Sequence, residues 1–207
     1  MNTRYAIPFH ALAFAAALAA TPVVASAQTA STAELDAAEA AGLTFMREEE
    51  KLARDVYQYF YPLWNLTLFD NISLSEQAHF EAIGALLDTY RLDDPALQDL
   101  PGVFQNAELQ QLYDTLVEQG GATALAALQV GALIEETDMV DIQKAIAATD
   151  QPDVIQVYGN LLRGSRNHLR AFVGAIEAQG VTYTAQVLPQ EIVDAIVDSP
   201  MERGGGK

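Results

Sequence analysis

The residues of this sequence that could do chemistry are acidic and imidazole side chains that interrupt apolar helical stripes. Glu76 and His79 stand three residues apart, a spacing that places both on one face of a helix, within reach of the same cation. Carboxylate with imidazole suits iron, manganese or zinc better than calcium or magnesium. The residues that break the stripes of four expected helices are Glu50, Glu76, His79, Glu135 and His168.

Three carboxylates and two imidazoles at similar depth in a helical core need compensation. A buried ionised carboxylate destabilises a fold unless it is paired, and a divalent metal ion is the simplest partner. The sequence contains no cysteine, which excludes thiolate metal sites, disulfides and a cysteine nucleophile. Any metal must therefore be held by oxygen and imidazole.

Two of these positions have a competitor next to them. Glu50 ends a run of three glutamates, and such a run usually forms a solvated helix face with at most one member inside. Helical periodicity favours Glu50 over Glu49, and Glu136 competes with Glu135 in the same way. A histidine on an apolar stripe is more often a hydrogen-bonded core residue than a ligand, so His168 alone leaves both interpretations open.

Four long helices must position these residues. Helix formers, capping residues and Pro or Gly breaks delimit them, with Ser31 and Ser73 expected as the first two N-caps. A long connection at about 91–105 and a short helix at about 106–119 separate the second long helix from the third, and another short helix follows at 189–198. The expected fold is an all-α four-helix bundle with a long crossover between its second and third helices. The predicted long helices cover residues 31–63, 73–90, 123–148 and 152–179.

The first residues are expected to be removed from the folded protein. Residues 1–27 combine Arg4, an apolar Ala-rich stretch and small residues ending at Ala27, the pattern of a secretory signal peptide. The rest is expected to form one helical domain over 28–199 and a flexible tail over 200–207. No other segment is apolar for long enough to span a bilayer, so we expect an exported protein, periplasmic or secreted, that is not held in a membrane after cleavage.

The charge balance is strongly acidic. The chain has 11 Lys and Arg against 28 Asp and Glu, so it lacks the basic surface that neutralises nucleic-acid phosphates. An acidic surface concentrates cations instead. Metal ions, and not nucleic acid, are the expected partners.

Several segments resemble a known superfamily. The run 50–60 resembles the first helix of rubrerythrin-like and ferritin-like di-iron proteins, in which a ligand Glu precedes an aromatic residue by seven positions. Residues 76–79 match the Glu-x-x-His of the second helix, and Glu135 falls where the third helix carries a ligand Glu. The segments similar to the ferritin-like family catalogued as domain of unknown function 2202 are 48–55, 131–136 and 161–172.

This resemblance implies a ferritin-like bundle that binds one or two ions, with iron the first expectation and manganese or zinc the alternatives. The superfamily carries a second Glu-x-x-His on its fourth helix, but here Ser165 stands three residues before His168. The missing carboxylate leaves the number of metals open, and water, Glu136 or Asp138 are candidates to complete the site. Without cysteine there is no rubredoxin-type centre, so a redox cycle would need an external electron donor.

The sequence leaves three functions open. The first is an exported metal-binding protein that oxidises its metal or reduces peroxide at an open metal position, with Tyr57 as a nearby hydrogen-bond donor. The second is a carrier or sequestering protein that uses the same site without turnover. In the third, the site has decayed into a salt-bridged network in which His168 and Arg166 pair with Glu50 or Glu135.

Overall fold

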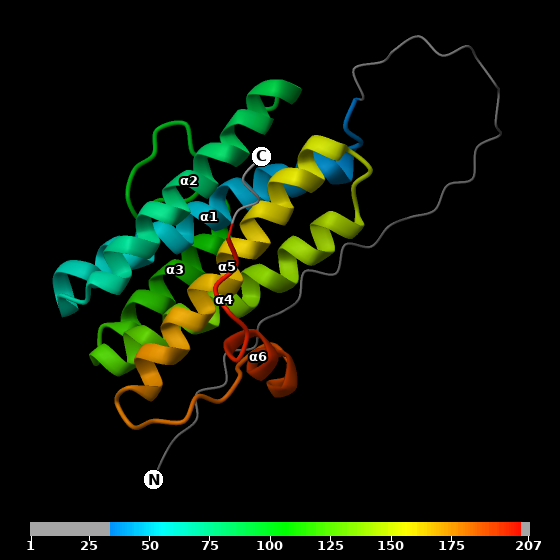
Figure 1. Ribbon diagram of the computed structural model, residues 1–207. Helices are drawn as coiled ribbons and strands as arrows, with labels where there is room; N and C mark the ends of the chain where they lie inside the picture. The colour runs from blue at the N-terminus through cyan, green and yellow to red at the C-terminus, as the bar shows by residue number, and fades with distance from the viewer. Residues whose placement is uncertain (1–33, 204–207) are drawn as a thin grey trace. The chain divides into compact units, whose positions relative to one another are not determined.

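The structure is a computed structural model that describes residues 34–203 (Figure 1). This part of the chain is all-α, as predicted, and contains no strand. None of its helices is both long and apolar enough to cross a membrane. The predicted signal peptide, residues 1–27, lies outside the described residues. The six helices are α1 (Ala37–Trp64), α2 (Thr67–Tyr90), α3 (Ala107–Gly120), α4 (Ala124–Ala147), α5 (Pro152–Glu177) and α6 (Gln190–Val197).

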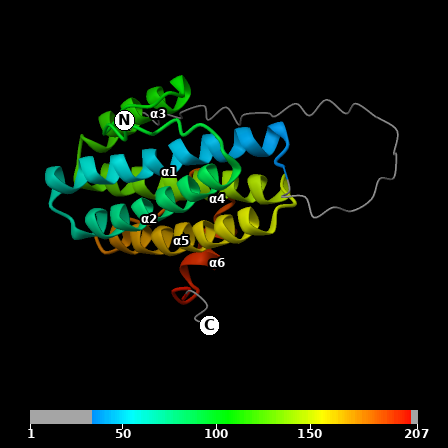
Figure 2. The same cartoon turned by 90° about the horizontal axis from the view of Figure 1, so that it is seen from above.

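The four long helices form an antiparallel bundle (Figure 2). Helix α1 packs on α2 and α4, and α5 packs on the same two helices, whereas within the described chain the backbones of α1 and α5, and those of α2 and α4, do not lie next to each other. These last two pairs are therefore diagonal. Thr149 hydrogen-bonds Glu39 at one corner, and Tyr90 hydrogen-bonds Asp153 at another. The ends of α4 and α2 thus lie beside the starts of α1 and α5, which confirms the crossover between α2 and α4.

Helix α1 begins later than the sequence predicted. Its N-cap is Asp36 and not Ser31, which lies outside the described residues. The Asp36 carboxylate accepts from the Glu39 N–H, and the Glu39 carboxylate accepts from the Asp36 N–H, both at 2.8 Å. This capping box satisfies two backbone donors at the helix start, and it places the N-cap five residues after the predicted one.

Helix α2 begins earlier than predicted. It starts at Thr67, and the expected cap, Ser73, lies inside the helix with its hydroxyl donating to the Asp70 carbonyl at 2.9 Å. Phe69 and Ile72 are buried in the core formed with the other helices. Tertiary burial of these two side chains extends the helix over a segment whose composition resembled a turn.

The connection 91–106, here called the link, packs along α1. Charged side chains of α1 that point away from the bundle centre bind it, so Glu48 is buried under the link while Glu50 is buried in the bundle core. The expectation that at most one of the three glutamates lies inside was therefore wrong. The contacts are Arg47 with Asp94, Glu48 with the Asn106 N–H, Lys51 with the Leu100 carbonyl, Arg54 with Asp99 and Asp55 with the Gly102 N–H.

Candidate metal centre

The bundle core holds two groups of ligand-type side chains that share one member. The first group is Glu50, Glu76 and His79, and the second is Glu76, Glu135 and His168. Within each group the ligand atoms all lie within 4.8 Å of one another. The four long helices each contribute, and α2 contributes twice. The structure thus brings together all five residues that interrupted the apolar stripes.

In the first group, His79 faces two carboxylates. Its Nδ1 lies 2.7 Å from Glu76 Oε2 and 3.3 Å from Glu50 Oε2. Glu50 is 1 % exposed and Glu76 is 2 % exposed. Gly164 of α5 makes room for this imidazole, because a Cβ at that position would lie 2.5 Å from His79 Cε1. Glu50, and not its competitor Glu49, belongs to the group.

In the second group, neighbours fix the orientation of both ligands from α4 and α5. His168 Nδ1 lies 2.7 Å from Glu76 Oε1 and 3.4 Å from Glu135 Oε2. His168 Nε2 lies 2.9 Å from Ser75 Oγ. A neutral His168 that donates its Nε2 proton to Ser75 keeps a lone pair on Nδ1, as a metal ligand requires. The Tyr57 hydroxyl donates to Glu135 Oε1 at 2.6 Å, which leaves Oε2 free to face His168.

Buried ligand atoms of these groups have no hydrogen-bond partner in the described chain. They include Glu50 Oε1, Glu76 Oε1 and His168 Nδ1. The last two lie only 2.7 Å apart but lack hydrogen-bond geometry. Buried polar atoms without a well-formed hydrogen bond are costly and uncommon, so the convergence of several such atoms favours a cation at this place. The residues therefore fit a divalent metal ion.

Without a metal ion, the carboxyl and imidazole groups of the cluster balance their charges by binding protons. Burial raises the pKa of Glu50 to about 7. Burial lowers the pKa of His168, but attraction from Glu76 and Glu135 outweighs it and raises that pKa to about 10. Burial also raises the pKa of Glu76, yet the charges of His168 and His79 bring it below its usual range. A metal ion must therefore displace protons from the imidazoles and carboxyl groups.

Glu136, the competitor of Glu135, has a structural partner elsewhere. Its fully buried carboxylate accepts from the Tyr183 hydroxyl at 2.6 Å and from the backbone N–H groups of Val187 and Leu188 at 2.7 Å. These bonds hold the segment after α5 against α4. Glu136 is thus directed away from the two groups, as periodicity predicted.

Arg166 does not take part in the core network. It pairs with Glu202 at 2.5 Å, and Arg170 pairs with the same carboxylate at 3.0 Å. The pairing of Arg166 with Glu50 or Glu135, which belonged to the third hypothesis, is therefore wrong, because the segment after α6 supplies a closer acid. Within residues 34–203, the three glutamates of the two groups form ion pairs with histidine and with no Lys or Arg.

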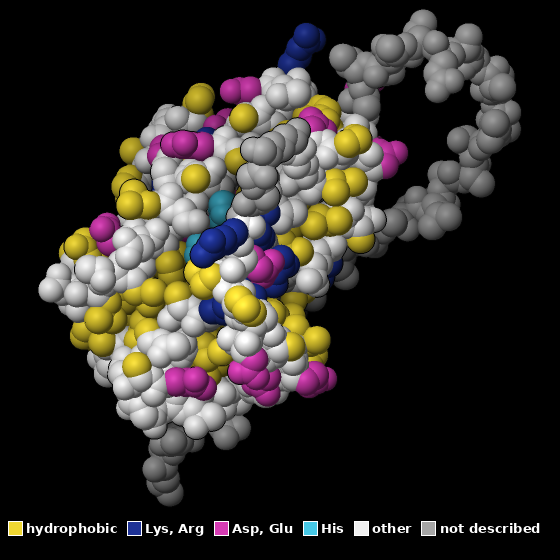
Figure 3. All heavy atoms as spheres, in the orientation of Figure 1, with side chains coloured by type: hydrophobic (Ala, Val, Ile, Leu, Met, Phe, Trp, Pro, Cys, Tyr) yellow, Lys and Arg dark blue, Asp and Glu magenta, His cyan; other side chains and the backbone are white. Residues whose placement is uncertain are grey.

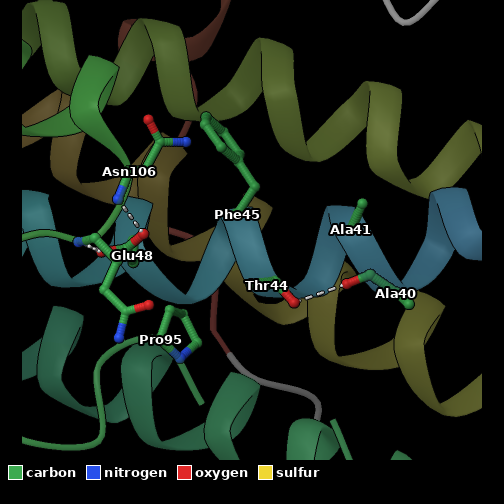
Figure 4. A pocket seen from close by; sticks show the side chains of 8 residues that line it. Ala40, Ala41, Thr44, Phe45, Glu48, Pro95 and Asn106 are labelled. Carbon is green, nitrogen blue, oxygen red and sulfur yellow. Dashed lines mark hydrogen bonds between the residues drawn. The ribbon is translucent and has the colours of Figure 1, made fainter. Parts of the chain in front are cut away.

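A pocket on α1 lies apart from the two groups (Figure 4). Its charged residue, Glu48, already accepts the Asn106 N–H at 3.0 Å. None of the five site residues lines it, so this pocket offers no continuation of the candidate centre. Its lining residues are Ala40, Ala41, Thr44, Phe45, Glu48, Pro95, Gln105 and Asn106.

Comparison with known proteins gives a family but no activity. Residues 39–200 match the family model described as "Uncharacterized protein domain (DUF2202)". The chain is 48 % identical over 163 residues to uncharacterized protein MJ0754 of Methanocaldococcus jannaschii, which covers 79 % of this chain and 88 % of that protein. The crystal structure of hypothetical protein MJ0754 from Methanococcus jannaschii has a TM-score of 0.81 at 44 % identity, covering 84 % of this chain and 100 % of that one. Both descriptions leave the function open.

Proposed function

The chain belongs to the DUF2202 family of uncharacterized proteins, and we propose that its bundle core binds transition-metal ions through Glu50, Glu76, His79, Glu135 and His168. The observation that carries this proposal is the convergence of ligand side chains from four helices around the shared Glu76. Three of these side chains, Glu50, Glu76 and His168, have a buried atom without a hydrogen-bond partner in the described chain. Iron is the first candidate and manganese or zinc the alternatives, because mixed carboxylate and imidazole sites suit these ions. The arrangement supports the ferritin-like resemblance of the sequence.

Glu76 is the organising ligand of this centre. Its Oε2 faces His79 and its Oε1 faces His168, each at 2.7 Å. One carboxylate can therefore serve a cation in each group. Ser75 and Tyr57 would orient His168 and Glu135 from outside the coordination sphere, the arrangement that raises metal affinity. A bound transition metal would supply Lewis acidity or one-electron redox chemistry.

The depth of the site favours a resident metal over a transported one. Its glutamates are almost fully buried, and the ligands come from four helices, so release requires the bundle to open. Part of the histidine side chains still reaches the surface (Figure 3), with 12 % of His79 and 10 % of His168 exposed. Small molecules such as water or peroxide can approach there. We therefore favour an oxidase or peroxidase, with an external electron donor, over a carrier.

Elemental analysis tests the metal proposal. The protein is purified without an affinity tag or chelator, and its metal content is compared with that of Glu76→Ala and His79→Ala. We expect bound iron, manganese or zinc in the wild type and a loss of at least one equivalent in both variants. Glu118→Ala, at an exposed position of α3, is the matched control and should keep the metal. A wild type without metal, even after anaerobic loading with Fe(II) or Mn(II), would overturn the proposal.

Peroxide consumption separates the enzyme from the carrier. With a chemical reductant present, the metal-loaded wild type is expected to consume peroxide, and Glu76→Ala is not. A protein that holds metal and consumes no peroxide or dioxygen would instead be a metal-storing or metal-carrying protein.

A further inference from the structure

A buried carboxyl group beside the candidate centre belongs to neither group of ligands. Asp138 lies on α4, three residues after Glu135, and is 6 % exposed. Residues at this spacing lie on one helix face, so Asp138 is directed toward the same part of the core as Glu135. Its Oδ1 atom is buried and has no hydrogen-bond partner in the described chain.

Asp138 is held in place by the residue that replaces the expected carboxylate of α5. The hydroxyl of Ser165, which is fully buried, donates to Asp138 Oδ2. One oxygen is thus anchored, and the other has no partner. An anchored carboxylate with a free buried oxygen is the usual form of a metal ligand that is supported by an outer hydrogen bond.

The surroundings of Asp138 include a glutamate from each ligand group. Burial and the charges of Glu50, Glu49 and Glu135 raise the pKa of Asp138 well above its usual range. Glu50 belongs to the first group and Glu135 to the second. Asp138 therefore lies close enough to one glutamate of each group to be affected by its charge. It approaches from α4, which is diagonal to α2, so Asp138 and the shared Glu76 stand on opposite sides of the core.

The charge of the core matches two divalent cations. With Asp138, the core holds four carboxyl groups beside two imidazoles. With neutral imidazoles, a single divalent cation would neutralise two of these carboxylates, and the other two would have to keep their protons. Two divalent cations neutralise all four carboxylates. Glu49 is not part of this sum, because it belongs to neither ligand group and its carboxyl group is hydrogen-bonded to Asp141.

We propose that Asp138 is a metal ligand shared by two cations, opposite Glu76, and that it replaces the carboxylate that α5 lacks at Ser165. This inference rests on the proposed metal-binding function. In the structure Asp138 lies outside both groups of three. Cations bound between Asp138 and the two groups would attract the free Oδ1 of Asp138 while Ser165 holds Oδ2.

Anaerobic loading with Mn(II) tests the inference. Bound manganese is counted by elemental analysis, and the exchange coupling between two ions is read by electron paramagnetic resonance. We expect two coupled Mn(II) ions per wild-type chain and a single uncoupled ion in Asp138→Asn, which keeps the size of the side chain. Asp141→Asn is the matched control, because Asp141 lies on the same helix but pairs with the exposed Lys144, and it should keep two ions.

Ser165→Ala gives a second, milder test if Asp138→Asn does not fold. It removes the hydroxyl and leaves the carboxylate, so the second Mn(II) should bind about 10 to 100-fold more weakly while the first is unaffected. Two coupled ions in Asp138→Asn, or unchanged affinities in Ser165→Ala, would overturn the inference and leave the metal proposal standing. A single ion in the wild type would also overturn it. A wild type that binds no Mn(II), iron or zinc would refute the proposed function itself.

Discussion

The imidazole of His79 lies directly against the backbone of Gly164. Helices α2 and α5 approach so closely here that a Cβ at residue 164 would stand 2.5 Å from His79 Cε1 and 2.6 Å from Nε2. A glycine on α5 is thus what allows His79 to turn Nδ1 toward Glu76 and Glu50. The position of a proposed ligand on one helix depends on the absence of a side chain on another.

Gly164→Ala should therefore weaken metal binding while the protein stays folded. Alanine favours the helix by about 1 kcal/mol, but its methyl group would push the His79 ring away from Glu76. We expect the metal affinity to fall by at least about tenfold, since a ligand is misplaced. Gly159→Ala and Gly174→Ala are matched controls on α5, because a Cβ at either position has no heavy atom within 4 Å. Equal affinities in all three variants would show that His79 does not need this space.

Tyr57→Phe should reduce both stability and metal affinity. The change removes the hydroxyl that donates to Glu135 at 2.6 Å and leaves a buried carboxylate oxygen without that donor. We expect a loss of about 1–3 kcal/mol in the free energy of unfolding, measured with urea, and a metal affinity lower by about 10 to 100-fold. Tyr158→Phe, also buried in the core, is the comparison variant. A Tyr57→Phe protein that binds metal like the wild type would exclude a positioning role for this hydroxyl.

The stability of the protein in chelator should fall as the pH rises from 5 to 9. The pKa of Glu50 is raised by burial to about 7, so the folded state holds a proton that the unfolded state loses near its ordinary value of 4.5. The pKa of His168 is raised to about 10, so its stabilising charge is complete below 6.5 and is lost as the pH rises through 10. Both groups make unfolding easier as the pH increases.

Thermal unfolding across this pH range measures the effect. His168→Asn should flatten the dependence above about pH 6.5. With metal present the sign reverses, because binding releases protons and strengthens with pH. A chelated wild type that becomes more stable between pH 5 and 9 would contradict the proposed proton balance.

Glu136→Gln should destabilise the C-terminal segment without removing metal. The carboxylate of Glu136 accepts hydrogen bonds from the N–H groups of Val187 and Leu188. An uncharged glutamine amide has one acceptor oxygen in place of two, and its NH₂ group cannot accept these bonds. We expect a loss of about 1–3 kcal/mol in unfolding free energy and faster proteolysis after residue 180. Metal content should match the wild type. Loss of metal in this variant, with full metal in Glu135→Gln, would reverse the roles that we assign to the two glutamates.

The sequence predicted the parts of the site that depend on spacing within one helix. Glu76 and His79 fall on one face because of the helical period, and the same period separates Glu50 from Glu49 and Glu135 from Glu136. The crossover followed from a long connection without periodicity. These features are local, so one sequence is enough to predict them.

The remaining parts depend on which residues of neighbouring helices lie opposite each other. Ser75 beside His168 and Gly164 beside His79 follow from the relative positions of α2 and α5, which no pattern within one helix encodes. The predicted start of α2 was too late because tertiary burial of Phe69 outweighs the local turn signals. The position of Asp138 could have been predicted as a ligand position, since Asp138 follows Glu135 by three residues, the spacing of Glu76 and His79.

Anomalous diffraction from crystals grown with Mn(II) locates the bound ions in the molecule. We expect a strong anomalous peak in the bundle core, within bonding distance of a Glu76 oxygen and of Nδ1 of His79 or His168, with a second peak on the other side of Glu76. Peaks confined to surface acids, with His168 still paired to Glu76 in a core that contains no metal, would contradict metal binding by these residues.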